Sequence, residues 1–234
     1  MRDSRALSLT VFLSLLFVAS GCAALIYELV WFHVLRLVIG SSSISIAALL
    51  VSFMGGMGLG NVVLPRLVPQ SWHPLRVYAG LELLIGGLGL VLLALLPAAQ
   101  EVYLSAVGYG FGGVMLRAAV CIACLLPPTM LMGATLPAVA RWAGGSRVGV
   151  ARTGLLYGAN TVGAVMGVLV ASFYLLRLFD TVTATFVAVG VNVFVALAAF
   201  VLAARCPQTV VPVAPEAQPI VTRPAVLAGA GVSG

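Results

Sequence analysis

"LPPTMLMGATLPAVARW" spans residues 126–142 and decides how many membrane helices this chain is expected to have. The segment carries Pro127, Pro128, Gly133 and Pro137 within apolar sequence. Proline lacks a backbone N–H and clashes with the preceding helical turn, and the bilayer core offers no water to bind the carbonyls that it frees. We therefore predict a hinge at these residues, where one helix breaks and a short re-entrant or surface helix follows over 129–142. A simple turn at the membrane surface is the alternative.

The composition indicates a membrane protein. Hydrophobic residues make up 62% of the chain and charged residues 8%, with a mean hydropathy of +1.18. A soluble domain has about 25% charged residues, and several apolar runs here exceed the roughly 18 residues that suggest a membrane-spanning helix. We predict an all-α integral membrane protein with about six transmembrane helices in addition to the short broken one. The predicted spans are 7–37, 44–64, 75–96, 103–126, 150–176 and 182–204.

The basic residues, all arginine, predict the orientation. Positive charge collects in the cytoplasmic loops of membrane proteins. With the N-terminus in the cytoplasm, only Arg36 and Arg177 lie outside and Arg117 lies within the membrane. We expect both termini in the cytoplasm and a bacterial inner-membrane location; the net charge of +6 then reflects topology and not nucleic-acid binding. The remaining arginines are all placed inside: Arg2, Arg5, Arg66, Arg76, Arg141, Arg147, Arg152, Arg205 and Arg223.

The end of the chain differs from the rest. Residues 207–234 are rich in Pro, Val and Ala and have no helical period. This composition is typical of a flexible extended segment. We predict a polytopic membrane domain over 1–206 and a cytoplasmic tail or truncated linker over 207–234.

Two charges are predicted deep in the membrane. Glu82 lies about 10 Å into its predicted helix, and Arg117 lies about 13 Å from the same side, by the helical rise. Because these depths match, we predict a Glu82–Arg117 ion pair between consecutive helices. The pair could lock the two helices together, or it could be a switchable pair beside a cavity.

Glu28 lies nearer the outer boundary, between Tyr27 and Trp31. Trp and Tyr are common at membrane interfaces, so one interpretation is an aromatic belt with Glu28 paired to Arg36 or Arg177. The other is an acidic and aromatic pocket for a cationic ligand, which cation–π attraction would help to bind.

The span over 150–176 carries two GxxxG motifs, Gly154/Gly158 and Gly163/Gly167. Small residues at this spacing allow close helix contact, which predicts a homodimer through these faces. Four polar side chains are candidate partners for the backbone groups that the prolines free. These are Asn160, Thr161, Thr129 and Thr135.

A weak echo links residues 53–68 ("FMGGMGLGNVVLPRLV") with residues 131–142 ("LMGATLPAVARW"). Repeated halves are common in transporter folds. Chance similarity in sequence rich in Gly and Leu explains a match this short equally well.

Five stretches in order carry a family resemblance: "SGCAALIYELVWFHVL", "SFMGGMGLGN", "PLRVYAGLELLIG", "LPPTMLMGATLPAVAR" and "GLLYGANTVGAVMGVLVASF". Together they resemble the N-terminal membrane region of spermidine synthase-like, fused major-facilitator-like integral membrane proteins. The resemblance implies major-facilitator-like packing and carries over best to Glu28, Glu82, Asn160 and the MGATLP segment. His33 stands where that family usually has arginine.

In that family a cytoplasmic aminopropyltransferase-like domain commonly follows the membrane region, so the resemblance implies such a domain or protein as a partner. This sequence has no Gly-rich turn after a strand and no acidic pair to deprotonate an amine, and His33 and His73 are isolated. We therefore expect no catalytic residue, cofactor or metal in this chain. The sequence predicts a transporter-like or ligand-binding module for polyamines or related cations. The alternative is a membrane anchor for a polyamine-synthase-like partner.

Overall fold

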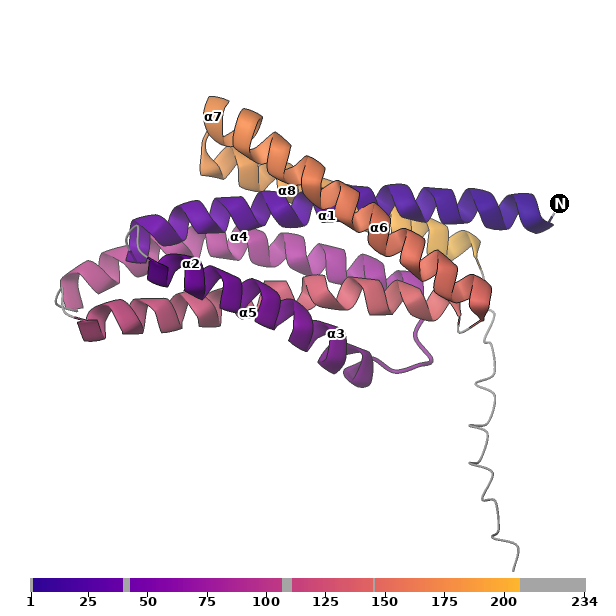
Figure 1. Ribbon diagram of the computed structural model, residues 1–234, viewed down its shortest axis with the longest axis horizontal. Helices are drawn as coiled ribbons and strands as arrows, with labels where there is room; N and C mark the ends of the chain where they lie inside the picture. The colour runs from indigo at the N-terminus through magenta and orange to yellow at the C-terminus, as the bar shows by residue number, and fades with distance from the viewer. Residues whose placement is uncertain (1, 40–42, 107–110, 145, 207–234) are drawn as a thin grey trace, which may run out of the picture.

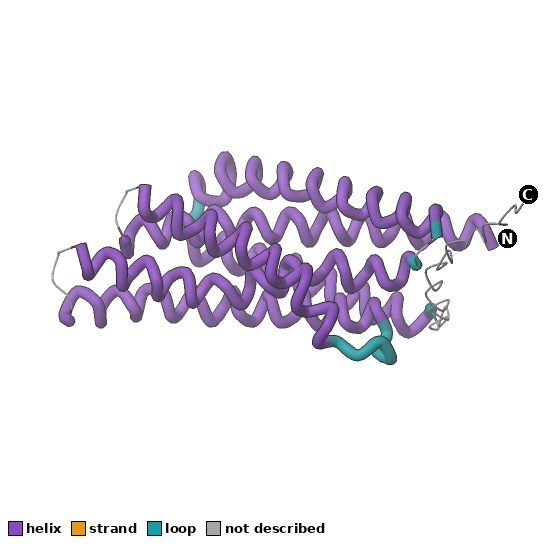
Figure 2. The backbone as a smooth tube through the Cα atoms, turned by 60° about the horizontal axis from the view of Figure 1, so that its bottom comes forward, coloured by secondary structure: helices purple, strands orange, loops and turns teal. Residues whose placement is uncertain are grey.

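The computed structural model describes residues 2–39, 43–106, 111–144 and 146–206, and the tail predicted over 207–234 lies outside these ranges. Every element in the described ranges is a helix (Figures 1 and 2). In chain order they are α1 (Arg2–Ile39), α2 (Ser43–Leu50), the π-helix η1 (Val51–Gly55), α3 (Gly56–Leu67), α4 (Pro74–Ala106), α5 (Phe111–Ala143), α6 (Arg147–Val170), the π-helix η2 (Ala171–Leu175), α7 (Leu176–Leu178) and α8 (Thr181–Arg205).

Six helices in this part of the chain are long and apolar enough to cross a membrane. The second of them is α2, η1 and α3 in sequence, and the fifth is α6, η2 and α7. The prediction of an all-helical protein with six helices able to span a membrane is therefore confirmed. Both π-helices lie inside a span, where such a local change of helical pitch is tolerated and often marks a functional segment.

The predicted break at Pro127 and Pro128 is wrong, because α5 runs as one helix from Phe111 to Ala143 through all three of its prolines. Proline has a helical φ and costs mainly a backbone hydrogen bond, which neighbouring side chains can offset in a membrane helix. Beside the prolines, the hydroxyl of Thr129 lies 2.9 Å from the carbonyl oxygens of Leu125 and Leu126 in its own helix and of Ser52 in η1, so it joins this part of α5 to the second span. The segment over 129–142 is thus the last part of the fourth span.

Two pairs of helices make backbone-to-backbone contact through glycine. A Cβ on Gly163 or Gly167 of α6 would overlap the backbone of Val18 or Cys22 of α1. Because the contacts advance in the same direction along both helices, α1 and α6 are parallel. α3 and α5 are parallel as well, because the contacts between the two spans advance from Ser52–Thr129 to Pro69–Arg141. Between these contacts, Gly56 meets the Thr129 side chain, and Gly60 and Gly133 meet the backbones of Met130 and Met57.

These contacts reveal an inverted repeat of three spans. An offset of 107 residues relates Gly56 to Gly163, Gly60 to Gly167, and the start of α4 (Pro74) to the start of α8 (Thr181). The first half, α1 to α4, and the second half, α5 to α8, therefore have the same order of elements but begin at opposite ends of the bundle. The contact of α1 with α6 corresponds to that of α5 with α3, and the contact of α1 with α8 corresponds to that of α5 with α4.

The echo between residues 53–68 and 131–142 does not mark a repeat, which leaves chance similarity as its explanation. These segments lie in α3 and α5, which pack against each other. They are contact partners and not equivalent positions of the repeat. The equivalent of Gly56 and Gly60 is the second GxxxG motif of α6, Gly163 and Gly167.

Candidate functional site: a buried polar cluster between α1, α4 and α8

Glu82 is the centre of a polar cluster inside the bundle. It lies eight residues after the start of α4, or about 12 Å along the helix, and its side chain is 1% exposed. The Ser20 hydroxyl of α1 donates a hydrogen bond of 2.6 Å to its Oε1. A buried charge costs several kcal/mol unless it is compensated, so a carboxyl at this depth calls for a role.

Tyr78 lies one turn before Glu82 on the same face of α4 and is fully buried. Its hydroxyl is directed toward the Glu82 carboxyl and the Ser20 hydroxyl, although it completes no hydrogen bond of good geometry with a described residue. The ring stacks on Phe17 of α1, with centroids 5.1 Å apart and planes 14° apart. This stacking fixes the ring, and thereby holds the phenol oxygen beside the carboxyl.

Asn192 approaches from α8. Its amide Nδ2 donates a hydrogen bond of 3.4 Å to the backbone carbonyl of Glu82, and its Oδ1 is buried without a partner in the described part of the chain. In the repeat, Leu84 of α4 is equivalent to Val191 of α8, 107 residues later. Both residues lie at the crossing of the two helices, between the contact of Glu82 with Asn192 and that of Gly86 with Val189. The two-fold axis that relates the halves therefore passes through this crossing of α4 and α8.

The crossing also lies near the middle of the part of α4 that is apolar enough to cross a membrane. The apolar span of α4 is Pro74–Leu95, whose centre falls within three residues of Glu82. The carboxyl is thus close both to the repeat axis and to the midplane, the region in which transporters with inverted repeats bind their substrates and coupling ions.

The predicted pocket of Glu28, Tyr27 and Trp31 is not assembled. Tyr27 and Trp31 are buried and stacked, with centroids 5.2 Å apart, and Trp31 also contacts Phe53 of η1. Glu28 projects from another face of α1 and is half-buried. Neither predicted ion pair of Glu28 is formed: the Arg36 guanidinium lies over the Phe32 ring at 5.8 Å, and Arg177 is exposed at the end of its span.

The predicted Glu82–Arg117 pair does not fit the register of α4 and α5. Arg117 belongs to α5, 26 residues before its end at Ala143, or about 39 Å along the helix. The end of α5 lies beside the start of α4, where Arg141 donates to the Pro69 carbonyl at 3.1 Å. Arg117 and Glu82 therefore differ in depth by roughly 27 Å. The prediction failed because it ended the helix at Leu126; the Arg117 side chain itself lies outside the described residues.

The polar residues of α6 do not serve the prolines of α5. Asn160 packs its backbone against Gly21 of α1, and Thr161 is exposed and donates to the Tyr157 carbonyl of its own helix. Of the four side chains predicted to bind freed backbone groups, Thr129 joins α5 to η1 and Thr135 binds the Met132 carbonyl of its own helix.

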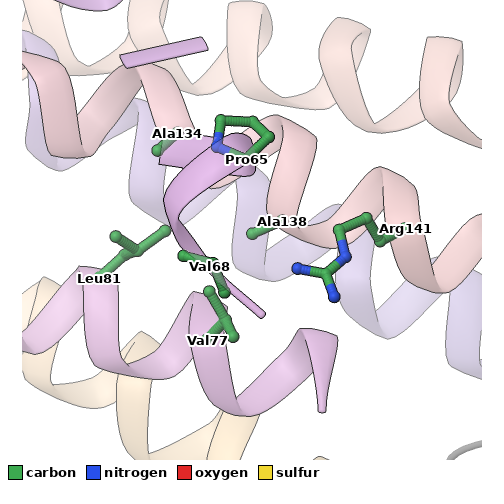
Figure 3. Close-up of a pocket in the computed structure, with 7 residues that line it drawn as sticks. All are labelled: Pro65, Val68, Val77, Leu81, Ala134, Ala138 and Arg141. Atoms are coloured by element: carbon green, nitrogen blue, oxygen red, sulfur yellow. The ribbon is translucent and has the colours of Figure 1, made fainter. Parts of the chain in front are cut away.

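A small cavity lies between α3, α4 and α5, and Arg141 is one of the residues that line it (Figure 3). Its volume is about 10 Å³, which is about the space of one water molecule. Drug-sized ligands occupy pockets of roughly 300 Å³ or more, so a polyamine does not fit here. The lining is apolar except for Arg141; its other members are Pro65, Val68, Val77, Leu81, Ala134 and Ala138.

Among the described residues, no group of three or more His, Cys, Asp or Glu side chains is placed to hold a metal ion. The Glu82 cluster consists of one carboxyl, hydroxyl groups and an amide. The arrangement is suited to holding or moving a proton, since hydroxyl groups can both donate and accept hydrogen bonds.

Comparison of the chain with protein-family models, curated proteins and solved structures gives no match.

Sequence reasoning found Glu82 but missed Ser20, Tyr78 and Asn192. Tyr78 could have been found, because it precedes Glu82 by four residues and so shares its helix face. Ser20 and Asn192 are single polar residues in apolar runs, and only the packing of α1 and α8 on α4 brings them to the carboxyl.

Proposed function

We propose that this chain is a transporter-like membrane module with major-facilitator-like packing, whose ligands are small cations of the polyamine class. The observation that supports it is the inverted repeat with a buried acid near its axis. Six-helix units built from three plus three inverted spans occur in major-facilitator transporters, and sites at the repeat interface near the midplane are typical of secondary transporters. The family resemblance favours polyamines as the class of cation.

The glycine contacts join one half to the other, so the six helices move as one body. Alternating access then needs a second body, and we propose a second copy of the chain. The first GxxxG of α6 supports this, because Gly154 and Gly158 face outward with no atom of the bundle within 4 Å of an added Cβ. Such small-residue faces allow membrane helices to associate closely.

The test is uptake of labelled putrescine and spermidine into proteoliposomes. We expect saturable uptake by the wild-type protein and its loss in Glu82→Gln, while Glu28→Gln serves as the matched acid outside the cluster. Absence of uptake by protein that is folded and inserted would reject the transporter. Crosslinking through single cysteines at Gly154 and at Gly58 would test the dimer, since both positions face outward but only the first lies in the proposed contact.

The second candidate is a membrane anchor for an aminopropyltransferase-like domain or protein in the cytoplasm, with both termini on that side. It is favoured by exposed arginines at the end of the bundle where α3 and α8 end and α4 and α6 begin. They would attract an acidic surface in a salt-dependent manner. Binding of such a purified protein, lost when these arginines are changed to Gln, would support the anchor. The exposed members are Arg66, Arg76, Arg147 and Arg205.

A further inference from the structure

We propose that the Glu82 carboxyl is a proton-binding site at the repeat axis, and that a proton is the cation it exchanges during transport. The exchange during transport rests on the proposed function, whereas the proton site itself does not.

The space at Glu82 is filled. The carboxyl is 1% exposed, and Leu13, Phe17 and Leu75 of the same core are 0 to 2% exposed. Ser20 already occupies Oε1 at 2.6 Å. An ammonium group or a metal ion would need this packing to open, but a proton adds no volume. The proton is therefore the cation that the site can bind without rearrangement of the core.

The partners of the carboxyl can serve both of its protonation states. When the carboxyl is ionised, the hydroxyl groups of Ser20 and Tyr78 can both point their protons toward it. When it takes up a proton from water, Oε1 keeps the Ser20 bond, the other oxygen carries the proton, and the Tyr78 hydroxyl turns to accept it. The Ser20 oxygen keeps its place in both states, and the Tyr78 hydroxyl needs only a small adjustment to complete its own hydrogen bond as donor or acceptor.

The described surroundings of Glu82 contain no formal charge that would hold it in one state. Ser20 of α1 binds the carboxyl, Asn192 of α8 binds the Glu82 backbone, and the adjacent Leu81 lies beside the apolar Ala134 and Ala138 of α5. Among the described titratable groups, Tyr78 and Tyr27 lie close enough for the charge of Glu82 to act on them. Arg117 lies six residues after the start of α5, at the end of that helix farther from Glu82.

Infrared difference spectroscopy of the full chain in lipid vesicles tests this directly. We expect a carboxylic-acid C=O band that appears on acidification, shifts in D₂O, and is lost in Glu82→Gln but kept in Glu28→Gln. If Glu82→Gln does not fold, Ser20→Ala gives the same information, because loss of the hydrogen bond to Oε1 should move the band to higher frequency. If neither change alters the bands while the bundle stays folded, the other acidic side chains account for all of them and the proposal is overturned.

The two proposals can fail separately. If the band behaves as expected but vesicles take up no polyamine, the proton site stands and the transporter is rejected. If polyamine uptake occurs and does not change when a pH gradient is imposed or reversed, proton exchange during transport is rejected and the transporter stands.

Discussion

The two parallel helix pairs use the same glycine spacing but differ in what surrounds it. In α1 and α6, Gly163 and Gly167 meet backbone alone, and neither helix contains proline. In α3 and α5, Gly56 and Gly60 occupy the equivalent positions, but these helices contain four prolines and a bridging threonine. Fewer backbone hydrogen bonds hold the second pair straight. The two pairs thus share one contact geometry, but we expect α1 and α6 to resist bending and α3 and α5 to allow it.

The largest effect is expected from filling a glycine contact. Gly163→Leu places side-chain atoms where the Val18 backbone lies, so α1 and α6 must separate. Overpacking usually costs about 1–3 kcal/mol, and rigid backbone on both sides puts this change at the upper end. Thermal unfolding in detergent should show a large loss of stability, with Gly158→Leu, which faces outward, as the control. Equal stability of the two variants would contradict the close α1–α6 contact.

The same change at the equivalent position should cost less. Gly60→Leu also meets backbone, that of Met130, but α5 can bend at its prolines to accommodate part of the added volume. Its melting temperature should lie between those of wild type and Gly163→Leu, with Gly58→Leu as the outward-facing control. If Gly60→Leu is the more destabilised variant, the α3–α5 pair is not the more adaptable one.

A smaller loss is expected from removing the bridging hydroxyl. Thr129→Val keeps the shape of the side chain but loses the contacts with three carbonyls, one of them on η1. Hydrogen bonds between membrane helices contribute about 0.6 kcal/mol on average, with a maximum of about 1.7. Thr161→Val, whose hydroxyl binds only its own helix, should have no measurable effect on unfolding. Similar losses in both variants would show that Thr129 does not join the two helices.

The smallest effect concerns the caps at opposite ends of the second half. The carboxylate of Asp180 accepts from the Thr183 N–H at 2.7 Å, and hydrogen bonding from Thr183 lowers the pKa of Asp180 below its usual 3.8. Its contribution to stability is therefore complete above about pH 3.8 and is lost as the pH falls through the lower, folded-state pKa.

This dependence can be measured by unfolding the wild type and Asp180→Asn from neutral to strongly acidic pH. The difference between them should disappear in acid. Ser146→Ala removes the cap of α6, which accepts from Gly149 at 3.1 Å, and should cost about 0.5 kcal/mol at every pH, the low end of the range for such caps. A cost of Asp180→Asn that is independent of pH would exclude the charged cap.

Length, hydropathy and charge are local properties. For this reason the sequence could predict the number of spans, their order, and that most arginines lie at one end of the bundle. The continuity of α5 could not, since a threonine beside the prolines and a neighbouring helix decide whether a helix survives them. That error in turn moved Arg117 to the wrong depth and suggested an ion pair with Glu82. Ser20 and Asn192 were missed because their role depends on contacts across 62 and 110 residues of sequence.

Because each half of the repeat packs against the other, the order of synthesis leaves some helix faces without their partners for a time. Gly21 of α1 packs against α6, and Gly56 and Gly60 of α3 pack against α5, so the first three spans enter the membrane before their partners exist. Gly56 is synthesised 73 residues before Thr129, and Gly21 is synthesised 139 residues before Asn160. At about 5–20 residues added per second, these faces wait roughly 4–30 s against lipid. During that time Ser20 and Glu82 have no α8 to cover them. A ribosome that stalls midway would leave a half-protein with unpacked glycine faces and an unshielded acid, which cellular quality control can recognise.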